Sequence, residues 1–258
     1  MLQTRISLTP QPGEERLTRE SRDLLAYLRS VPPIPEEDDP NGWYHQIREH
    51  LLRSPRERME RWAWFVGGDP RRGGDQCELQ HVRFDPVRVV RALCDYEVAF
   101  VVVGMGAGYL RGAPYPSYNI DITPSLDSGN LAGLERVLEV LEARPLERDE
   151  WGSVEKHSLP GYRRLLTSAG MVNVVDAPWE LGGYDRVKEN AACLEVAEGL
   201  VVSVASLEDV INSKEAMRDM SERPLHNRTM DSLHVLMGRE VLALRKKYGA
   251  RWNLSTAS

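Results

Sequence analysis

The sequence predicts an α/β fold, with a small mixed β-sheet, an N-terminal helical extension and C-terminal helices. Two observations predict this class. From residue 85 onward, short apolar strand patterns alternate with amphipathic helix patterns, and a hairpin pattern follows them. The first 80 residues instead contain helical patterns around a segment rich in proline and acidic residues. We therefore expect an extension at 1–80, a sheet domain at 81–240 and a helix end with a tail at 241–258.

The bulk composition is typical of a soluble globular protein. The 258 residues carry a formal net charge of −6, and 41% are hydrophobic and 28% charged. The chain lacks the basic excess that drives nonspecific nucleic-acid binding. No signal peptide is visible, and the most apolar stretch, 98–103, is too short to span a bilayer. The three scattered cysteines predict reduced thiols, so we expect a cytoplasmic protein without a membrane partner.

The extension is predicted to hold three helices, at 17–28, 43–52 and 54–66. The first two are separated by 31–40, whose four prolines and acidic cluster predict a linker. In the third helix, Ser54 is the expected N-cap, and Glu57 completes a capping box. A loop follows at 67–75. An aromatic and basic cluster in this region either packs on the core or stacks nucleic-acid bases: Trp43, Arg61, Trp62 and Trp64.

The sheet domain is predicted from alternating periodicities. Strands are expected at 100–103, 118–123, 163–167, 171–175 and 200–204, and helices at 87–96, 106–110, 130–143, 207–217 and 230–248. Asp85 and Ser206 are the expected N-caps of two of these helices. The turn at 168–170 joins two of the strands into a hairpin.

The turn at 103–108 is a candidate phosphate site, because an apolar strand ends there in small residues and a helix begins. Glycine lets the backbone approach phosphate oxygens, and a helix N-terminus favours anions. The turn is not a Walker loop, since no Gly-Lys-Ser/Thr follows, and Tyr109 stands where a dinucleotide fingerprint requires glycine. Close packing at a tight strand–helix turn is the alternative explanation.

Three stretches in order resemble the nucleotidyltransferase superfamily, which has the DNA polymerase β-like fold. Residues 100–122, FVVVGMGAGYLRGAPYPSYNIDI, are similar to its apolar strand, glycine turn, short helix and Asp-x-Asp strand. Residues 167–175, TSAGMVNVV, are similar to the hairpin that carries the family's third carboxylate. Residues 204–216, VASLEDVINSKEA, are similar to its Ala-Ser-Leu-Glu-Asp-Leu-Ile-x-x-Lys helix. The chain resembles bacterial toxin-side members of the AbiE and MenT kind, as well as uncharacterised members.

The resemblance implies Mg²⁺-dependent transfer of a nucleoside monophosphate from a nucleoside triphosphate to an RNA, protein or small-molecule acceptor. Asp121 would hold the metal and Lys214 the phosphates. Arg223 and Arg228, which resemble the family's Arg-Pro-Lys-Asp-Arg segment, would clamp an anionic substrate. The residues that would bind the triphosphate are Gly104, Met105, Gly106 and Ser117.

The expected acids are only partly present. The first carboxylate of the Asp-x-Asp pair falls on Asn119, the second on Asp121 and the third on Asn173. The acid of the Lys-Asp-Arg segment falls on Asn227, or on His226 with a different gap. An amide oxygen is neutral and a poorer Mg²⁺ ligand than a carboxylate. One carboxylate and triphosphate oxygens can hold a single Mg²⁺, whereas a two-metal site is compromised.

Two nearby acids are possible substitutes for the missing ligands. Asp176 lies three residues beyond Asn173, where strand alternation places it on the opposite face, and Glu180 follows on a loop. The alternative function is a degenerate nucleotidyltransferase fold that binds nucleotide, RNA or protein, in a toxin–antitoxin or defence system. A third is recruitment to other chemistry in a biosynthetic pathway, with the Asn side chains orienting substrate.

Overall fold

The structure is a computed structural model that describes residues 49–51, 53–67, 84–114, 116–146, 161–220, 231–232, 234–239 and 241–243. Several sequence predictions fall outside these residues: the helix at 17–28, the linker at 31–40, most of the loop at 67–75, and Trp43. Three of the predicted site residues, Arg223, Arg228 and Asn227, also lie outside them.

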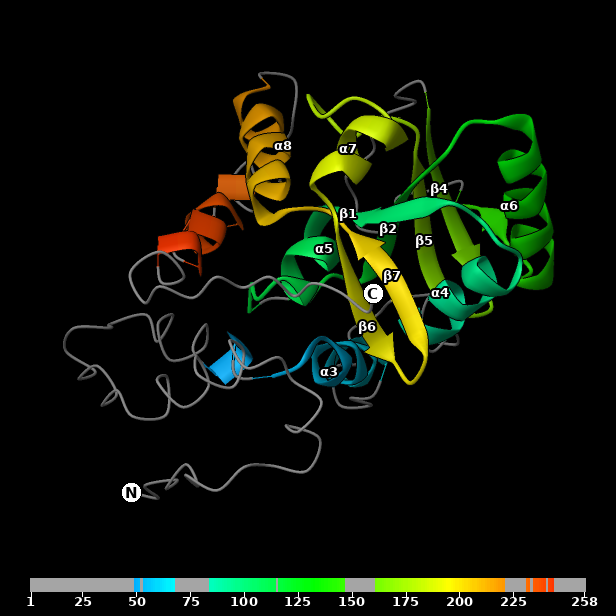
Figure 1. Cartoon of the computed structure of the whole chain (residues 1–258), viewed down its shortest axis with the longest axis horizontal. Coiled ribbons are helices and arrows are strands. Elements are labelled where there is room, and N and C mark those ends of the chain that lie inside the picture. The colour runs from blue at the N-terminus through cyan, green and yellow to red at the C-terminus, as the bar shows by residue number, and fades with distance from the viewer. Residues whose placement is uncertain are drawn as a thin grey trace.

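A seven-stranded mixed sheet forms the centre of the molecule, in the order β3-β4-β5-β2-β1-β7-β6 (Figure 1). At its middle, β1 runs antiparallel to β2 and parallel to β7, and β2 runs parallel to β5. The strand bounds are β1 Phe100–Val103, β2 Asn119–Pro124, β3 Arg144–Pro145, β4 Tyr162–Thr167, β5 Gly170–Val175, β6 Ala192–Ala197 and β7 Leu200–Val204. This topology confirms the predicted α/β fold with a mixed sheet.

Helices flank the sheet (Figure 1). Their bounds are α3 Pro55–Gly67, α4 Pro86–Asp95, α5 Gly104–Leu110, α6 Ser128–Val140, α7 Tyr184–Asn190 and α8 Leu207–Asp219. The described residues between 231 and 243 are also helical, within the range predicted for the last helix. In the part of the chain that the structure describes, no helix has the length and apolar character needed to cross a membrane.

The sequence patterns located most of these elements but missed β3, α7 and β6. Strand β6 lies at an edge of the sheet, where Leu194 and Val196 are buried and the residues between and before them are exposed. Buried Leu194 and Val196 alternate with exposed Cys193 and Glu195, a period-2 strand pattern that the sequence prediction did not use. Helix α7 has seven residues and buries only Val187 among them, so it carries no apolar periodicity.

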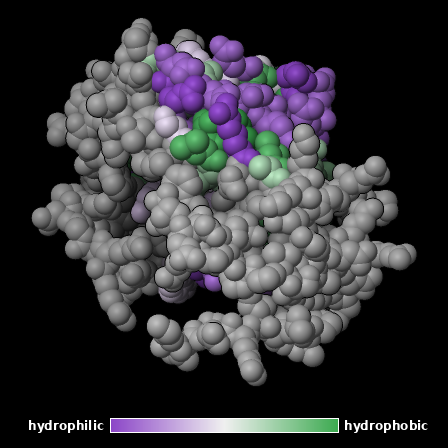
Figure 2. All heavy atoms as spheres, turned by 90° about the vertical axis from the view of Figure 1, so that its left-hand side faces the viewer, coloured by the Kyte–Doolittle hydropathy of each residue, from purple (hydrophilic) through white to green (hydrophobic). Residues whose placement is uncertain are grey.

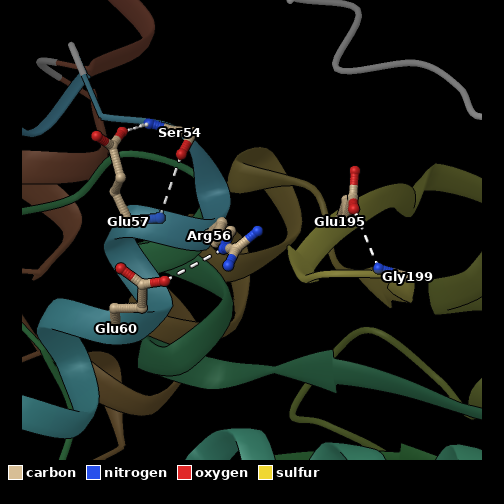
Figure 3. A network of polar contacts seen from close by, with 6 residues as sticks. All are labelled: Ser54, Arg56, Glu57, Glu60, Glu195 and Gly199. Atoms are coloured by element: carbon tan, nitrogen blue, oxygen red, sulfur yellow. Dashed lines mark hydrogen bonds and ion pairs between the residues drawn. The ribbon is translucent and has the colours of Figure 1, made fainter. Parts of the chain in front are cut away.

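The predicted capping box begins α3 (Figure 3). The Ser54 hydroxyl accepts a hydrogen bond from the Glu57 backbone N–H at 3.2 Å, and the Glu57 carboxylate accepts one from the Ser54 backbone N–H at 2.6 Å. These two bonds satisfy N–H groups that a helix N-terminus leaves unpaired. Figure 3 also shows the β6–β7 turn near this helix, where the Gly199 N–H donates to Glu195.

Trp62 attaches α3 to the sheet domain. Its side chain is fully buried in the main hydrophobic core, where its ring packs against Phe84 and Tyr109. The indole N–H donates to the Ser117 carbonyl at 2.5 Å. Truncation of a buried Trp side chain to Ala typically lowers the free energy of unfolding by about 3–5 kcal/mol. Trp62 therefore packs α3 onto the core, whereas Trp64 is 61% exposed.

Candidate functional site

Strand pairing brings together three residues that are far apart in the sequence. Asp121 on β2 lies opposite Val103 at the end of β1 and opposite Asn173 on β5. Residues paired in adjacent strands point to the same face of the sheet. Because α5 begins immediately after Val103, the Gly104 turn lies against the same cluster. The positions that resemble the family's three acids, 119, 121 and 173, therefore meet at one place.

Two amides hold the Asp121 carboxylate. Asn119 Nδ2 donates to Asp121 Oδ1 at 2.6 Å, and Asn173 Nδ2 donates to the same oxygen at 2.7 Å. The Ser117 hydroxyl in turn donates to the Asn119 amide oxygen at 2.8 Å. Asn173 is buried, and its amide oxygen has no hydrogen-bond partner within the described structure. We call Asn119, Asp121 and Asn173 the amide–carboxylate cluster.

Loss of hydration is the largest influence on the pKa of Asp121, whose side chain is half-buried. It raises the pKa of Asp121 above its ordinary value, because the charged form loses its hydration. The Asn173 and Asn119 hydrogen bonds oppose this rise of the pKa, as do the positive charges of Lys214 and Arg164. Arg164 lies on β4 directly opposite Asn173, and the sequence reasoning did not identify it. A strand-pairing register was needed to find it.

The glycines of the 104–108 turn have structural reasons that do not involve a ligand. Gly104 has a φ of +61°, and a side chain there would overlap the Asp121 carboxylate. A Cβ on Gly106 would lie 2.5 Å from the Trp62 ring, and one on Gly108 would contact Val210. Helix α5 begins at Gly104, two residues before the predicted start at 106. Close packing therefore accounts for Gly104 and Gly106, whereas a Cβ on Gly108 would make only an ordinary van der Waals contact.

Lys214 points from α8 toward a buried acid. Its Nζ donates to Asp231 Oδ1 at 3.0 Å, and the Asp231 side chain is 2% exposed. One hydrogen bond uses one of the three N–H donors of the ammonium group. Its charge still acts on Asp121, as the pKa of that carboxyl indicates. Lys214 is thus part of the electrostatic surroundings of the cluster without contacting it.

The cluster does not fit a pair of Mg²⁺ ions. Mg²⁺ prefers several anionic oxygens in octahedral geometry, and here Asp121 offers one carboxylate, one oxygen of which accepts two N–H bonds. Among the described residues, no three His, Cys, Asp or Glu side chains lie close enough to hold a metal ion. Asp176 lies beside Gly161, beyond the end of β5, and Glu180 lines a separate pocket.

Comparisons with known proteins give structural similarity only. No protein-family model and no curated protein matches the sequence. The solution structure of the antibiotic-resistance factor ANT(2'')-Ia is 19% identical, with a TM-score of 0.35 over 64% of this chain and 91% of that chain. The crystal structure of ANT(2'')-Ia with adenylyl-2''-tobramycin is 17% identical, with a TM-score of 0.40 over 64% and 95%.

A third solved structure belongs to a Thermotoga maritima protein assigned as a nucleotidyltransferase. It is 16% identical, with a TM-score of 0.33 over 67% of this chain and 99% of that chain. The three similar structures thus come from nucleotidyltransferases or a protein assigned as one. All three TM-scores are below 0.5.

Proposed function

We propose that this chain is a nucleotidyltransferase-type protein that binds a nucleoside triphosphate without the metal pair of a transfer site. The observation that carries the proposal is the amide–carboxylate cluster. Residues 119, 121 and 173 resemble the positions of the family's three acids, and they come together from two strands. In this chain they are two amides and one carboxylate, with both amides donating to the carboxylate.

Electrostatics supports binding that does not require a metal. A group of three carboxylates repels a triphosphate unless cations neutralise it. Here two of the three charges are absent. Lys214 and Arg164 act on Asp121 as nearby positive charges, and Lys214 retains N–H donors for a phosphate. A triphosphate can thus approach this site with less repulsion than a three-acid site would impose.

The ligand contacts that we propose follow from the same geometry. The phosphates would lie near Lys214, and the backbone of Gly104 and Met105 would face them. Trp62 covers Gly106, so this residue would contribute to the shape of the turn. Ser117, whose hydroxyl bonds Asn119, would orient the cluster. No transfer step is assigned, because the cluster offers no second carboxylate as a base for an acceptor hydroxyl.

Thermal melting of the full chain with each nucleoside triphosphate, in Mg²⁺ or in EDTA, tests the proposal. A ligand at about 100 times its dissociation constant stabilises the folded state by about 2.7 kcal/mol, which a melt detects. We expect the same stabilisation with Mg²⁺ and with EDTA. Lys214→Ala should lose most of it, and Lys188→Ala, which changes an exposed lysine on α7, should retain it.

A gain-of-function variant sharpens the test. Asn119→Asp combined with Asn173→Asp restores the three-acid pattern, so its stabilisation by a triphosphate should require Mg²⁺. Absence of any melting shift with the unmodified chain would overturn nucleotide binding. A shift of the unmodified chain that disappears in EDTA would instead favour the Mg²⁺-dependent transferase that the family resemblance implies.

A further inference from the structure

Two helices outside the sheet reach α5, whose first turn lies against the amide–carboxylate cluster. Helix α5 contacts both α8, which carries Lys214, and α3, which carries Trp62 (Figure 1). On the side of α8, the described side chains are mostly hydrophilic and surround a small hydrophobic area (Figure 2). Helix α3 instead reaches α5 through the Trp62 ring, which is fully buried. The hydrophobic core therefore links α3 to the site.

Trp62 contacts both segments that lead to the cluster. Its ring lies against the first turn of α5, because a Cβ added at Gly106 would be 2.5 Å from Trp62 Cη2. Its indole N–H donates to the Ser117 carbonyl oxygen at 2.5 Å, in the segment between α5 and β2. A buried indole N–H needs such a partner. One side chain thus fixes the segment before β2 relative to the start of α5.

Hydrogen bonds continue from Ser117 to the Asp121 carboxylate. The Ser117 hydroxyl donates to the Asn119 amide oxygen at 2.8 Å, and Asn119 Nδ2 donates to Asp121 Oδ1 at 2.6 Å. The two ends of an amide differ, since its oxygen only accepts and its nitrogen only donates. By binding the amide oxygen, the Ser117 hydroxyl keeps the amide nitrogen directed at Asp121. The position of Ser117 therefore decides whether Asp121 receives this donor.

The indole N–H has a role that ring packing alone does not explain. Phe84 and Tyr109 pack against the Trp62 ring, and a Phe ring at position 62 could keep contacts of this kind. Such a ring would lack the donor to Ser117. Trp64 lies on the same helix but is 61% exposed, so it offers a matched indole outside the core.

We infer that Trp62 is a positioning residue for the amide–carboxylate cluster, so that docking of α3 regulates the proposed triphosphate site. Trp62 acts through Ser117 and Asn119. While α3 is docked, the Ser117 segment stays in place and Asn119 donates to Asp121. Displacement of α3 would release Ser117, and the cluster would lose the arrangement that we propose for the ligand. The effect on a ligand rests on the proposed function, whereas the coupling of α3 to the cluster does not.

Nuclear magnetic resonance of the full chain without a ligand tests the coupling by itself. The side-chain amide signals of Asn119, assigned with Asn119→Asp, report on its hydrogen bonds. We expect Trp62→Phe to shift these signals. Trp64→Phe makes the same change at an exposed position, and Met59→Leu changes only packing at a buried position of α3, so both should leave the signals in place. Unchanged Asn119 signals in Trp62→Phe, or equal shifts in Met59→Leu, would overturn the inference.

Isothermal titration with ATP, GTP, CTP and UTP tests the effect on the site. We expect Trp62→Phe and Ser117→Ala each to weaken the tightest of the four by about two- to tenfold, as loss of one hydrogen bond would. The double variant should bind no more weakly than Ser117→Ala, because Trp62 acts through that hydroxyl. Additive losses would overturn this route. Met59→Leu should bind as the unmodified chain does.

Two further outcomes separate this coupling from the proposed function. If the unmodified chain binds none of the four nucleotides, nucleotide binding and its regulation are overturned, and the Asn119 signals alone decide whether α3 is coupled to the cluster. If Trp62→Phe fails to fold, Ser117→Ala replaces it, because this residue is only half-buried. Asn119 signals that stay unchanged in Ser117→Ala would then contradict the hydrogen-bond route.

Discussion

The carboxylates of Asp121 and Asp209 differ in the hydrogen-bond donors that surround them. Asp121 lies on the sheet and receives two amide hydrogen bonds on one oxygen, from β2 and β5. Asp209 lies in the first turn of α8 and has one oxygen that is buried without a donor. The fold thus supplies two hydrogen-bond donors to Asp121 Oδ1 and none to Asp209 Oδ2 within the described residues. A carboxylate oxygen that receives donors from the fold stabilises the structure, whereas a buried oxygen without a donor costs free energy.

The largest loss of stability is expected when Asp121 is replaced by a residue that cannot accept its two hydrogen bonds. Replacement of Asp121→Leu removes the acceptor of two amide N–H groups, one on the half-buried Asn119 and one on the buried Asn173. An unpaired buried group costs about 1–3 kcal/mol, whereas water can reach a half-buried one, so we expect a loss of about 1–3 kcal/mol in the free energy of unfolding. Urea denaturation measures this loss. A loss below about 1 kcal/mol would show that water or rearranged amides replace the carboxylate.

The free energy of unfolding should also depend on pH, because Asp121 titrates differently in the folded and unfolded states. Burial raises the pKa of Asp121 in the folded state, so the folded state binds the proton more tightly than the unfolded state. The stabilisation by protonated Asp121 is fully present below the unfolded-state pKa of about 3.9 and is lost as pH rises through the folded-state pKa.

The measurement is urea unfolding from about pH 3 to pH 7, for the unmodified chain and for Asp121→Asn. The difference in unfolding free energy between them should fall with rising pH and then level off. A difference that instead grows with pH would mean that the amides and nearby cations outweigh burial and hold the carboxylate in its charged form.

The smallest change in stability is expected at Asp209. Asp209→Asn should change the free energy of unfolding by less than about 1 kcal/mol. The change removes a negative charge from the first helix turn, which is worth about 0.3–1 kcal/mol, while relieving a buried unpaired oxygen. The Ser206 cap, which accepts the residue 209 backbone N–H at 3.0 Å, is retained. A loss above about 2 kcal/mol would show that Asp209 has a structural role like that of Asp121.

Much of the fold could be predicted because its signals are local. The capping box of Ser54 and Glu57, and the N-caps Asp85 and Ser206, each involve atoms within three residues of one another. Strand β1 stands out as an uninterrupted apolar run that is buried throughout. Helix α7 was missed because seven residues with one buried side chain lack such a signal, whereas the alternating pattern of β6 is present in the sequence and was not used.

The candidate site was only partly predictable. The order of the motifs identified positions 119, 121 and 173, and strand pairing brings them together. Their roles as phosphate or metal contacts remain predictions. Neither Arg164 opposite Asn173 nor the pocket between α8 and the segment that leads into α7 has a sequence signal, because each depends on which segments become neighbours.

Local sequence was enough to predict the helices and strands with strong periodicity, their caps, and the amides at positions where acids were expected. The tertiary structure was needed to show that those amides donate hydrogen bonds to Asp121. Asn173 and Asp121 are 52 residues apart, and the parallel register of β2 and β5 makes them neighbours. The same is true of Asp209, whose unsatisfied oxygen depends on the segment packed beside α8. The physical reason is that hydrogen-bond satisfaction depends on neighbours in space, and folding rather than local sequence chooses those neighbours.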